Sequence, residues 1–471
     1  MEALEDWIAR QERRSIAGML MSVSPVDLVK ARPGFGQTVQ ARRGAIVASP
    51  VLAAYDPDPD YFFHWYRDSA VVVDALRLLH AEGRLGEAAL THLADFVDFS
   101  RALQGLDGRA LNAASSWRDR VRPDFTQYLR SPAELATVNG DAVAADTRVN
   151  PDGTLDISRW TRPQHDGPPL RALALLRWLR EPAASAARDG ALGERIAALV
   201  HDDLAFTRAR WNTPSFDIWE EESGLHYYTL RMSAAALEAG AAWRAAHGDA
   251  DSANALRAEA GRILRLLDGY WLEEQGHYRS RVLADGTRSA KELDIAVILA
   301  AIHSDDDLAA VAPAAADAPG PARDEAPAGG GPRHGPGDPR LHASLARLDA
   351  VFDAQYAINR GRPAQRAPAM GRYAGDVYYS GGAYYFSTLG AAEFCFRAAL
   401  RSTAPRTWTA RGEAYLETVR AHTPGNGDLS EQFDQRTGEQ TSARHLAWSY
   451  AAFLTCAAAR RRAAAAAAAA A

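Results

Sequence analysis

The sequence predicts an all-α protein organised as an (α/α)6 barrel, and two observations lead to this prediction. Apolar residues recur at the i, i+3, i+4 spacing of a helix face in twelve segments, while sustained period-two alternation is almost absent. The segments are also joined alternately by short and long connections. If consecutive helices run up and down, every long connection lies at the same end of one barrel.

The twelve predicted helices follow in chain order, each from its own run of helical periodicity. They cover residues 2–18, 67–82, 86–104, 168–182, 188–211, 226–246, 249–270, 291–303, 341–359, 383–401, 404–421 and 441–460. Connections from an even to the following odd helix are mostly a few residues, as at 247–248 and 402–403.

Connections from an odd to the following even helix are long and hold much of the Gly, Trp and Tyr. They span about 19–66, 105–167, 212–225, 271–290, 360–382 and 422–440. Long irregular loops in compact domains are usually functional. We therefore expect the active face at this end of the barrel.

Length alone allows roughly three domains for 471 residues. The loop asymmetry instead favours one catalytic unit over residues 1–460. Residues 304–340 are rich in Ala, Pro and Gly and have no apolar stripe, so we interpret them as a low-complexity insertion on the far face. Residues 461–471, mostly alanine, are interpreted as a low-complexity tail, either an extension of the last helix or disordered.

Composition excludes several classes of function. Lys and Arg number 53 against 59 Asp and Glu, and this net charge of −6 without a basic face makes nucleic acid an unexpected partner. Two cysteines, Cys395 and Cys456, can build neither a disulfide framework nor a Cys-rich zinc site. The longest apolar runs are shorter than the ~20 residues of a membrane helix, and the amino terminus is acidic and amphipathic. We expect a cytoplasmic protein without membrane contact, or a secreted one if the sequence was trimmed.

The first two long connections place aromatic residues beside charged ones. Tyr61 and Trp65 precede the adjacent pair Arg67 and Asp68, and the second connection holds Trp160 among two Arg, Gln, His and Asp. A buried aromatic staple with a helix cap explains either stretch alone. Sugars, however, stack on aromatic rings and offer hydroxyls to Arg and Asp.

Other long connections supply carboxylates in similar company. The third contains Trp219, Glu220 and Glu221, and the sixth contains Glu431. The fifth contains Arg372, Asp376 and Tyr378, while Trp448 follows the sixth. A single Glu run is usually a solvated first helical turn. Five loops with this shared chemistry on one face instead suggest glycoside hydrolysis, which needs one carboxylic acid and one carboxylate.

Other chemistries lack their motifs in this sequence. HExxH, GxxxxGK[ST] and GxSxG are all absent. The run Asp305-Asp306-Asp307 lies at the wrong end of the barrel for a magnesium-diphosphate site. We expect neither a metal nor a cofactor.

The ordered loop motifs resemble those of glucoamylases, glycoside hydrolase family 15. The resemblance runs from about Leu4 to Ala459 and is carried by YFFHWYRDS from Tyr61, WTRPQHDG from Trp160, DIWEE from Asp217, GRYAGDVYY from Gly371, SEQFD from Ser430 and SARHLAWSY from Ser442.

This resemblance implies an (α/α)6 enzyme that releases β-glucose, with inversion, from the non-reducing ends of maltooligosaccharides, starch or glycogen. It implies that Glu220 is the general acid and Glu431 the general base. The implied substrate-binding residues are Tyr61, Trp65, Arg67, Asp68, Trp160, Trp219, Glu221, Arg372, Asp376, Tyr378 and Trp448. The α-glucan is then the expected partner, and we expect a monomer.

The chain departs from the family pattern where His165, Gly375 and Tyr384 stand in place of Arg, an acidic residue and Trp. An aromatic residue expected near Asp156 is also missing. We expect these positions at the rim of the pocket. Hydrolysis of trehalose or of α-1,6-linked isomaltose or dextran is therefore an alternative, and a non-catalytic glucan-binding protein is a lesser one.

Overall fold

A computed structural model describes residues 2–54, 58–181, 190–305 and 333–469. Within these ranges, twelve helices form two rings, an inner one and an outer one that packs around it. The inner ring consists of α2 (Tyr66–Ala81), α6 (Gly167–Arg180), α9 (Tyr227–Ala246), α11 (Ala296–His303), α13 (Tyr385–Ala399) and α15 (Ala447–Ala469). The outer ring consists of α1 (Leu4–Leu20), α3 (Glu87–Leu103), α8 (Ala191–Arg210), α10 (Ala250–Asp268), α12 (Pro339–Gln355) and α14 (Pro405–Ala421).

The two rings differ in how their helices bury side chains. Outer helix α10 buries only positions spaced three and four apart, as expected for a helix with one face on the core: Ala253, Leu256, Ala260, Ile263 and Leu267. Inner helix α13 is buried along its whole length, and its charged residues Glu393 and Arg397 pair with each other at 2.8 Å. A helix buried on all sides must pair its charges in this way.

The inner helices contact one another in the closed order α2, α6, α9, α11, α13, α15 and back to α2. Each odd-numbered helix of the prediction lies in the outer ring and each even-numbered one in the inner ring. The prediction of an all-α (α/α)6 fold is therefore confirmed. No described helix is both long enough and apolar enough to cross a membrane.

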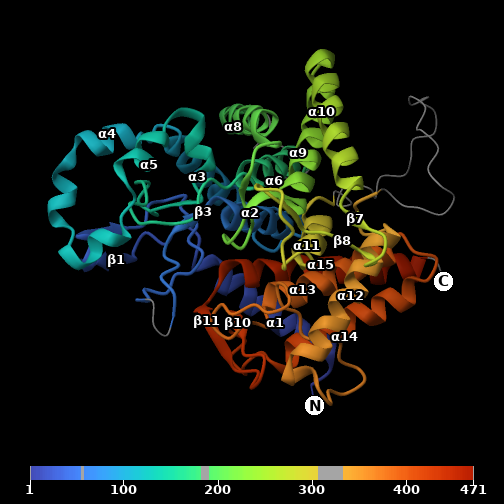
Figure 1. Cartoon of the computed structure of the whole chain (residues 1–471). Helices are drawn as coiled ribbons and strands as arrows, with labels where there is room; N and C mark the ends of the chain where they lie inside the picture. Colours follow the sequence, from blue (N-terminus) through green and yellow to red (C-terminus); the bar gives the residue numbers. More distant parts are fainter. Residues whose placement is uncertain (1, 55–57, 182–189, 306–332, 470–471) are drawn as a thin grey trace.

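Short elements occupy the connections that lead from the outer to the inner ring. In the part of the chain that the structure describes, the strands pair in five small antiparallel sheets: β1 (Val29–Arg32) with β2 (Gln37–Gln40), β3 (His64–Trp65) with β4 (Arg148–Val149), β5 (Ser215–Phe216) with β6 (Ser223–His226) and β9 (Arg281–Leu283), β7 (Trp271–Leu272) with β8 (His277–Tyr278), and β10 (Ser430–Phe433) with β11 (Gln440–Arg444). Short α-helices α4 (Gly108–Ala113) and α5 (Pro132–Thr137) lie with β1 in a lobe to the left of the barrel in Figure 1.

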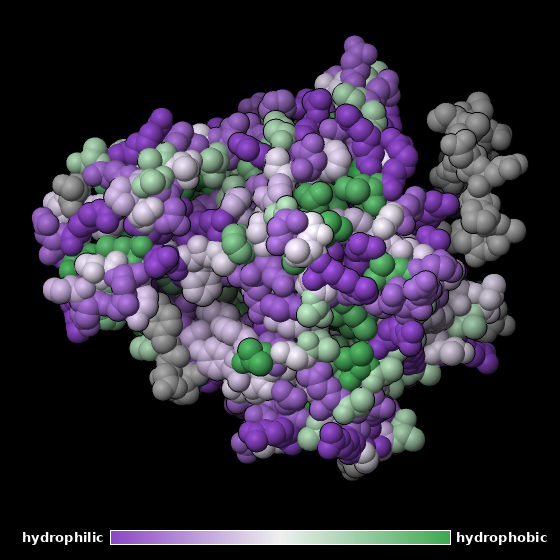
Figure 2. All heavy atoms as spheres, in the orientation of Figure 1, coloured by the Kyte–Doolittle hydropathy of each residue, from purple (hydrophilic) through white to green (hydrophobic). Residues whose placement is uncertain are grey.

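Short 3-10 turns complete these connections, at Pro33–Phe35, Ser115–Arg120, Pro123–Tyr128, Gly140–Ala145 and Ala357–Asn359. The lobe has a small apolar core of its own, formed by Phe35, Trp117, Val121, Leu135 and Ile157. The face of the molecule in Figure 2 is mostly hydrophilic, with apolar side chains in small separate groups.

Two predicted helix starts are wrong. The helix predicted from 291 begins at Ala296, and the one predicted from 441 begins at Ala447 because residues 440–444 pair with β10 as β11. The alanine tail continues α15 to Ala469. Of the predicted insertion at 304–340, residues 306–332 lie outside the described residues.

The contact between α1 and α15 depends on a glycine. A Cβ atom on Gly18 would lie 2.4 Å from the ring of Tyr450, whose hydroxyl accepts the backbone N–H of Leu429 at 3.2 Å. We predict that Gly18→Ala lowers the free energy of unfolding by about 1–3 kcal/mol through overpacking, measured by urea denaturation.

The matched control is Gly261→Ala on α10, where the nearest neighbour of a new Cβ is the end of the Arg265 side chain at 3.4 Å. This substitution should be neutral or stabilise by about 0.5–1 kcal/mol, because alanine favours a helix over glycine. Equal effects of the two substitutions would contradict the packing argument.

Candidate active site

A pocket opens at the end of the barrel where the long connections meet. It is lined by Ala48, Tyr61, Trp65, Arg67, Asp68, Trp160, Ile218, Trp219, Glu220, Glu221, Arg372, Tyr378, Phe386, Glu431, Leu446 and Trp448. These residues come from five of the six long connections and from the starts of α2, α13 and α15. Every predicted site residue lines this pocket except Asp376, which lies buried behind Arg372.

Glu220 projects from a tight turn between β5 and β6. Its backbone has φ of +66°, a left-handed conformation that is uncommon for a residue with a side chain. Three donors surround the carboxylate: Trp65 Nε1 at 2.8 Å, an Arg67 terminal nitrogen at 3.1 Å, and Trp160 Nε1. All three stabilise negative charge on this side chain.

Asp217 holds the turn in place. Its carboxylate accepts the backbone N–H groups of Trp219 at 2.8 Å and Glu222 at 3.0 Å, and it receives Arg281 at 2.8 Å. Arg281 also pairs with Asp294, which in turn accepts the indole N–H of Trp219 at 2.9 Å. Burial raises the pKa of Asp294 to about 6.

Sequence reasoning did not select Arg281, which begins β9, or Asp294, which lies shortly before α11. The available signal was weak: a charged residue directly before the apolar run Ile295–Ile302. Only the fold places both side chains behind the Glu220 turn.

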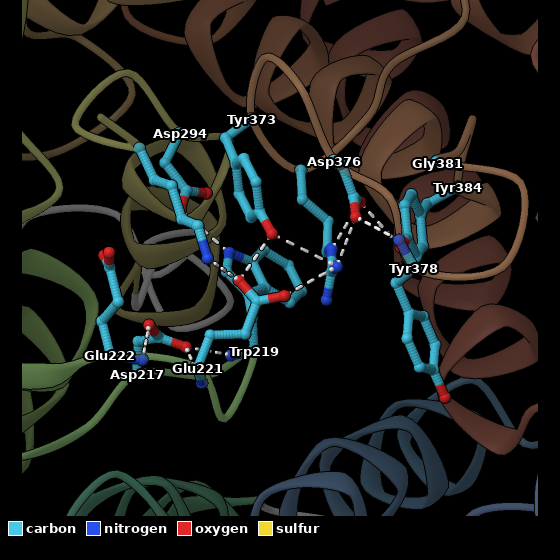
Figure 3. A network of polar contacts seen from close by, with 12 residues as sticks. Asp217, Trp219, Glu221, Glu222, Asp294, Tyr373, Asp376, Tyr378, Gly381 and Tyr384 are labelled. Carbon is cyan, nitrogen blue, oxygen red and sulfur yellow. Dashed lines mark hydrogen bonds and ion pairs between the residues drawn. The ribbon is translucent and has the colours of Figure 1, made fainter. Parts of the chain in front are cut away.

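Glu221, the next residue, is held by three donors of its own (Figure 3). Its carboxylate accepts Lys291 Nζ at 2.7 Å, the Tyr373 hydroxyl at 2.5 Å and an Arg372 terminal nitrogen at 3.0 Å. Asp376 accepts Arg372 Nε at 2.7 Å and, at 2.6 Å, the same terminal nitrogen that donates to Glu221. Lys291 and Tyr373 were not among the predicted site residues.

Glu431 lies on β10 across the pocket from the Glu220 turn. It accepts the Ser442 hydroxyl from β11, and the Tyr61 hydroxyl lies 3.5 Å from both carboxylate oxygens. Tyr61 in turn shares a hydrogen bond of 2.7 Å with the Tyr378 hydroxyl. Burial raises the pKa of Glu431 to about 7, although the Ser442 hydrogen bond opposes this rise by favouring the ionised form.

Arg67 and Asp68 lie in the first turn of α2 and line the pocket. Arg67 is buried and donates to Asp166 at 3.1 Å as well as to Glu220. Burial raises the pKa of Asp68 to about 6. The Arg67 guanidinium lies 5.7 Å from the centre of the Trp448 ring, which stacks on Phe386 and lines the pocket.

Three residues that differ from the family pattern were expected at the rim of the pocket, and for His165 and Tyr384 this expectation is wrong. His165 is buried outside the pocket, with its ring 5.6 Å from Phe206, and Tyr384 is fully buried beneath the pocket. Gly375 is exposed, with φ of +79°. Asp156 is buried and paired with Arg148 and Arg162.

The arrangement can protonate one oxygen and deprotonate another within the same pocket. Glu220 and Glu431 supply the two carboxyl groups in different surroundings, and aromatic rings with paired Arg and Asp surround them. Among the described residues, no cluster of His, Cys, Asp and Glu is arranged to hold a metal ion. An (α/α)6 barrel with two carboxyl groups in one pocket has the arrangement that glycoside hydrolysis requires.

The chain belongs to glycosyl hydrolases family 15, whose family model matches residues 144–411 and 401–458. The chain is 29% identical over 456 residues to a protein of Neurospora crassa named glucoamylase. That alignment covers 88% of this chain but 63% of the relative, so the chain spans less than two thirds of that protein.

Solved structures show the same fold. The family 15 glucoamylase from Hypocrea jecorina superimposes with a TM-score of 0.73 at 25% identity, covering 98% of this chain and 73% of that one. The glucoamylase of Hormoconis resinae gives a TM-score of 0.72 at 26% identity, covering 97% and 74%. The family resemblance predicted from the loop motifs is confirmed.

The Ser442 hydrogen bond should set the pH at which Glu431 ionises. Ser442→Ala removes a donor that favours the carboxylate, so the pKa of Glu431 should rise. Below this pKa the side chain is protonated and cannot accept a proton. We predict that the acid limb of kcat/KM for an α-glucoside moves up by about one pH unit.

The control is Ser449→Ala, which removes another buried hydroxyl, one that donates to the Ser430 carbonyl at 2.8 Å. It should leave the acid limb unchanged. An unmoved limb in Ser442→Ala, or one displaced to lower pH, would show that this hydroxyl does not favour the ionised base.

Proposed function

We propose that the chain is an inverting, exo-acting glucan 1,4-α-glucosidase that releases β-glucose from the non-reducing ends of maltooligosaccharides, starch or glycogen. The observation that carries this proposal is the placement of Glu220 and Glu431 in one pocket, with different partners. Membership in family 15 and the named glucoamylase relatives support it.

Glu220 is the general acid in this proposal. It gives its proton to the glycosidic oxygen as the bond to the anomeric carbon breaks. The carboxylate that remains is stabilised by Arg67, Trp65 and Trp160, which already point at it. These donors interact more strongly as charge develops, so they lower the barrier rather than only bind the substrate.

Glu431 is the general base. It takes a proton from the water that attacks the anomeric carbon from the face opposite the leaving group. Inversion requires the two carboxyl groups to stand ~6.5–9.5 Å apart so that this water fits. Tyr61 and Ser442 orient the carboxylate, and its pKa of about 7 makes it a competent proton acceptor near neutrality.

The remaining pocket residues bind the sugars. Arg67 and Asp68 hold hydroxyls of the terminal glucose, Tyr61 and Trp65 line the same part of the pocket, and Trp448 forms its floor. The second sugar contacts Trp160, Glu221 and Arg372, with Trp219, Tyr378 and Asp376 supporting that wall. In this proposal Trp448 closes the floor, so that a chain end can enter but a chain cannot pass through.

Two further predictions concern the protein in solution. The monomeric state is tested by light scattering on a size-exclusion column, where one copy of 50.9 kDa is the expected species. The cytoplasmic location is tested by fractionating the source cells and assaying the activity in each fraction.

The anomer of the product tests the mechanism. Proton NMR on freshly digested maltotriose should show β-glucose before mutarotation. Glu220→Gln and Glu431→Gln should each lower kcat by about 10²–10⁴-fold, because each removes one proton-transfer step. The control Glu439→Gln, at an exposed position in the turn between β10 and β11, should retain activity.

The initial release of α-glucose, or full activity in Glu220→Gln, would overturn the mechanism. Faster turnover of trehalose or isomaltose than of maltose would redirect the substrate assignment within the family. Glucan binding with no glucose released would favour the non-catalytic alternative.

A further inference from the structure

A buried tyrosine hydroxyl links the pocket wall at Arg372 to the strand that carries Glu431. Tyr384 directly precedes α13, and its side chain is fully buried and does not line the pocket. Its hydroxyl donates to Asp376 Oδ2 at 2.9 Å and accepts Gln432 Nε2 at 2.8 Å. A hydroxyl can donate and accept at once, whereas phenylalanine at this position could do neither.

On one side, the Tyr384 hydroxyl completes the shell of donors around Asp376 (Figure 3). This buried carboxylate receives both edge nitrogens of Arg372, and its Oδ1 accepts the Tyr378 backbone N–H at 2.9 Å. The bidentate contact fixes the plane of the guanidinium. Arg372 is thereby held against the pocket wall, where it reaches Glu221.

On the other side, the hydroxyl holds Gln432, the residue that follows Glu431 on β10. The same amide nitrogen donates to the Tyr378 carbonyl at 3.1 Å, and the amide oxygen accepts the Ser380 hydroxyl at 2.9 Å. Gln432 therefore joins β10 to the segment 378–380. The same segment also reaches the surroundings of Glu431, because the Tyr378 hydroxyl hydrogen-bonds to Tyr61, which lies beside Glu431.

We propose that Tyr384 is a positioning residue that couples the second-sugar contact at Arg372 to the placement of the base Glu431. This inference rests on the proposed function. A second sugar that engages Arg372 fixes Asp376, Tyr384 and Gln432 in turn. Binding energy from a part of the substrate that does not react is thus used to align the reacting groups.

The coupling selects for substrates whose second unit carries hydroxyls. Maltose offers them, whereas p-nitrophenyl α-glucoside places an aromatic ring in the same position and has none to offer Arg372. Without the Tyr384 hydroxyl, Arg372 can still touch the second sugar, but the contact no longer sets the position of β10. The higher kcat that we expect for maltose than for p-nitrophenyl α-glucoside should then be lost.

Tyr384→Phe tests the coupling in the full chain. We expect kcat on maltose to fall about tenfold, the effect of one hydrogen bond to a charged group. The KM for maltose should change less than about threefold, and kcat on p-nitrophenyl α-glucoside should also change less than about threefold. Gln432→Met, which removes the partner on the other side, should give the same pattern.

The matched control is Tyr385→Phe. This neighbouring tyrosine is equally buried, but its hydroxyl contacts the His422 carbonyl and Gln440 outside the pocket network. Thermal unfolding of all three variants separates loss of fold from loss of coupling. The control should leave the ratio of kcat values on the two substrates unchanged.

Several results would overturn the coupling. These are equal losses on both substrates in Tyr384→Phe and Gln432→Met, a rise in KM alone, unchanged kinetics, or the same selective loss in Tyr385→Phe. If the wild-type chain hydrolyses neither substrate, the proposed function itself fails, whatever the variants do.

Discussion

Burial of the six inner helices is the constraint on which the rest of the molecule depends. These helices are surrounded by other helices, so their polar groups must pair internally or lie at the helix ends. Glu393 and Arg397, for example, pair with each other within α13. Arg67 and Asp68 instead lie in the first turn of α2, at the end of the barrel where the long connections converge.

The loops at that end carry their own rigid support. Asp217 and Asp294 are buried and both pair with Arg281, and Asp217 accepts backbone N–H groups of the turn that presents Glu220. Side chains on a connection would ordinarily be mobile. Here the ion pairs replace helical packing and give the turn the fixed geometry that proton transfer requires.

The two carboxyl groups differ because their neighbours differ. Glu220 accepts hydrogen bonds from a guanidinium and two indole N–H groups. Glu431 is buried beside the Ser442 and Tyr61 hydroxyls, and burial dominates its pKa. In the proposed reaction, the neighbours of Glu220 stabilise the charge that remains after it donates its proton. Glu431, in contrast, is held ready to accept a proton.

The sequence alone determined the barrel, because helical periodicity and the alternation of short and long connections are local properties of the chain. It also indicated most of the residues that line the pocket, since aromatic, Arg and carboxylate residues cluster within single loops. It could not determine that β11 replaces the first turn of the last predicted helix, because residues 440–444 become a strand only by pairing with β10. The tertiary structure alone decided that Tyr384 lies beneath the pocket and that Lys291, Arg281 and Ser442 support its carboxylates. Contacts between residues far apart in the chain leave no local pattern in the sequence, so only the folded barrel brings them together.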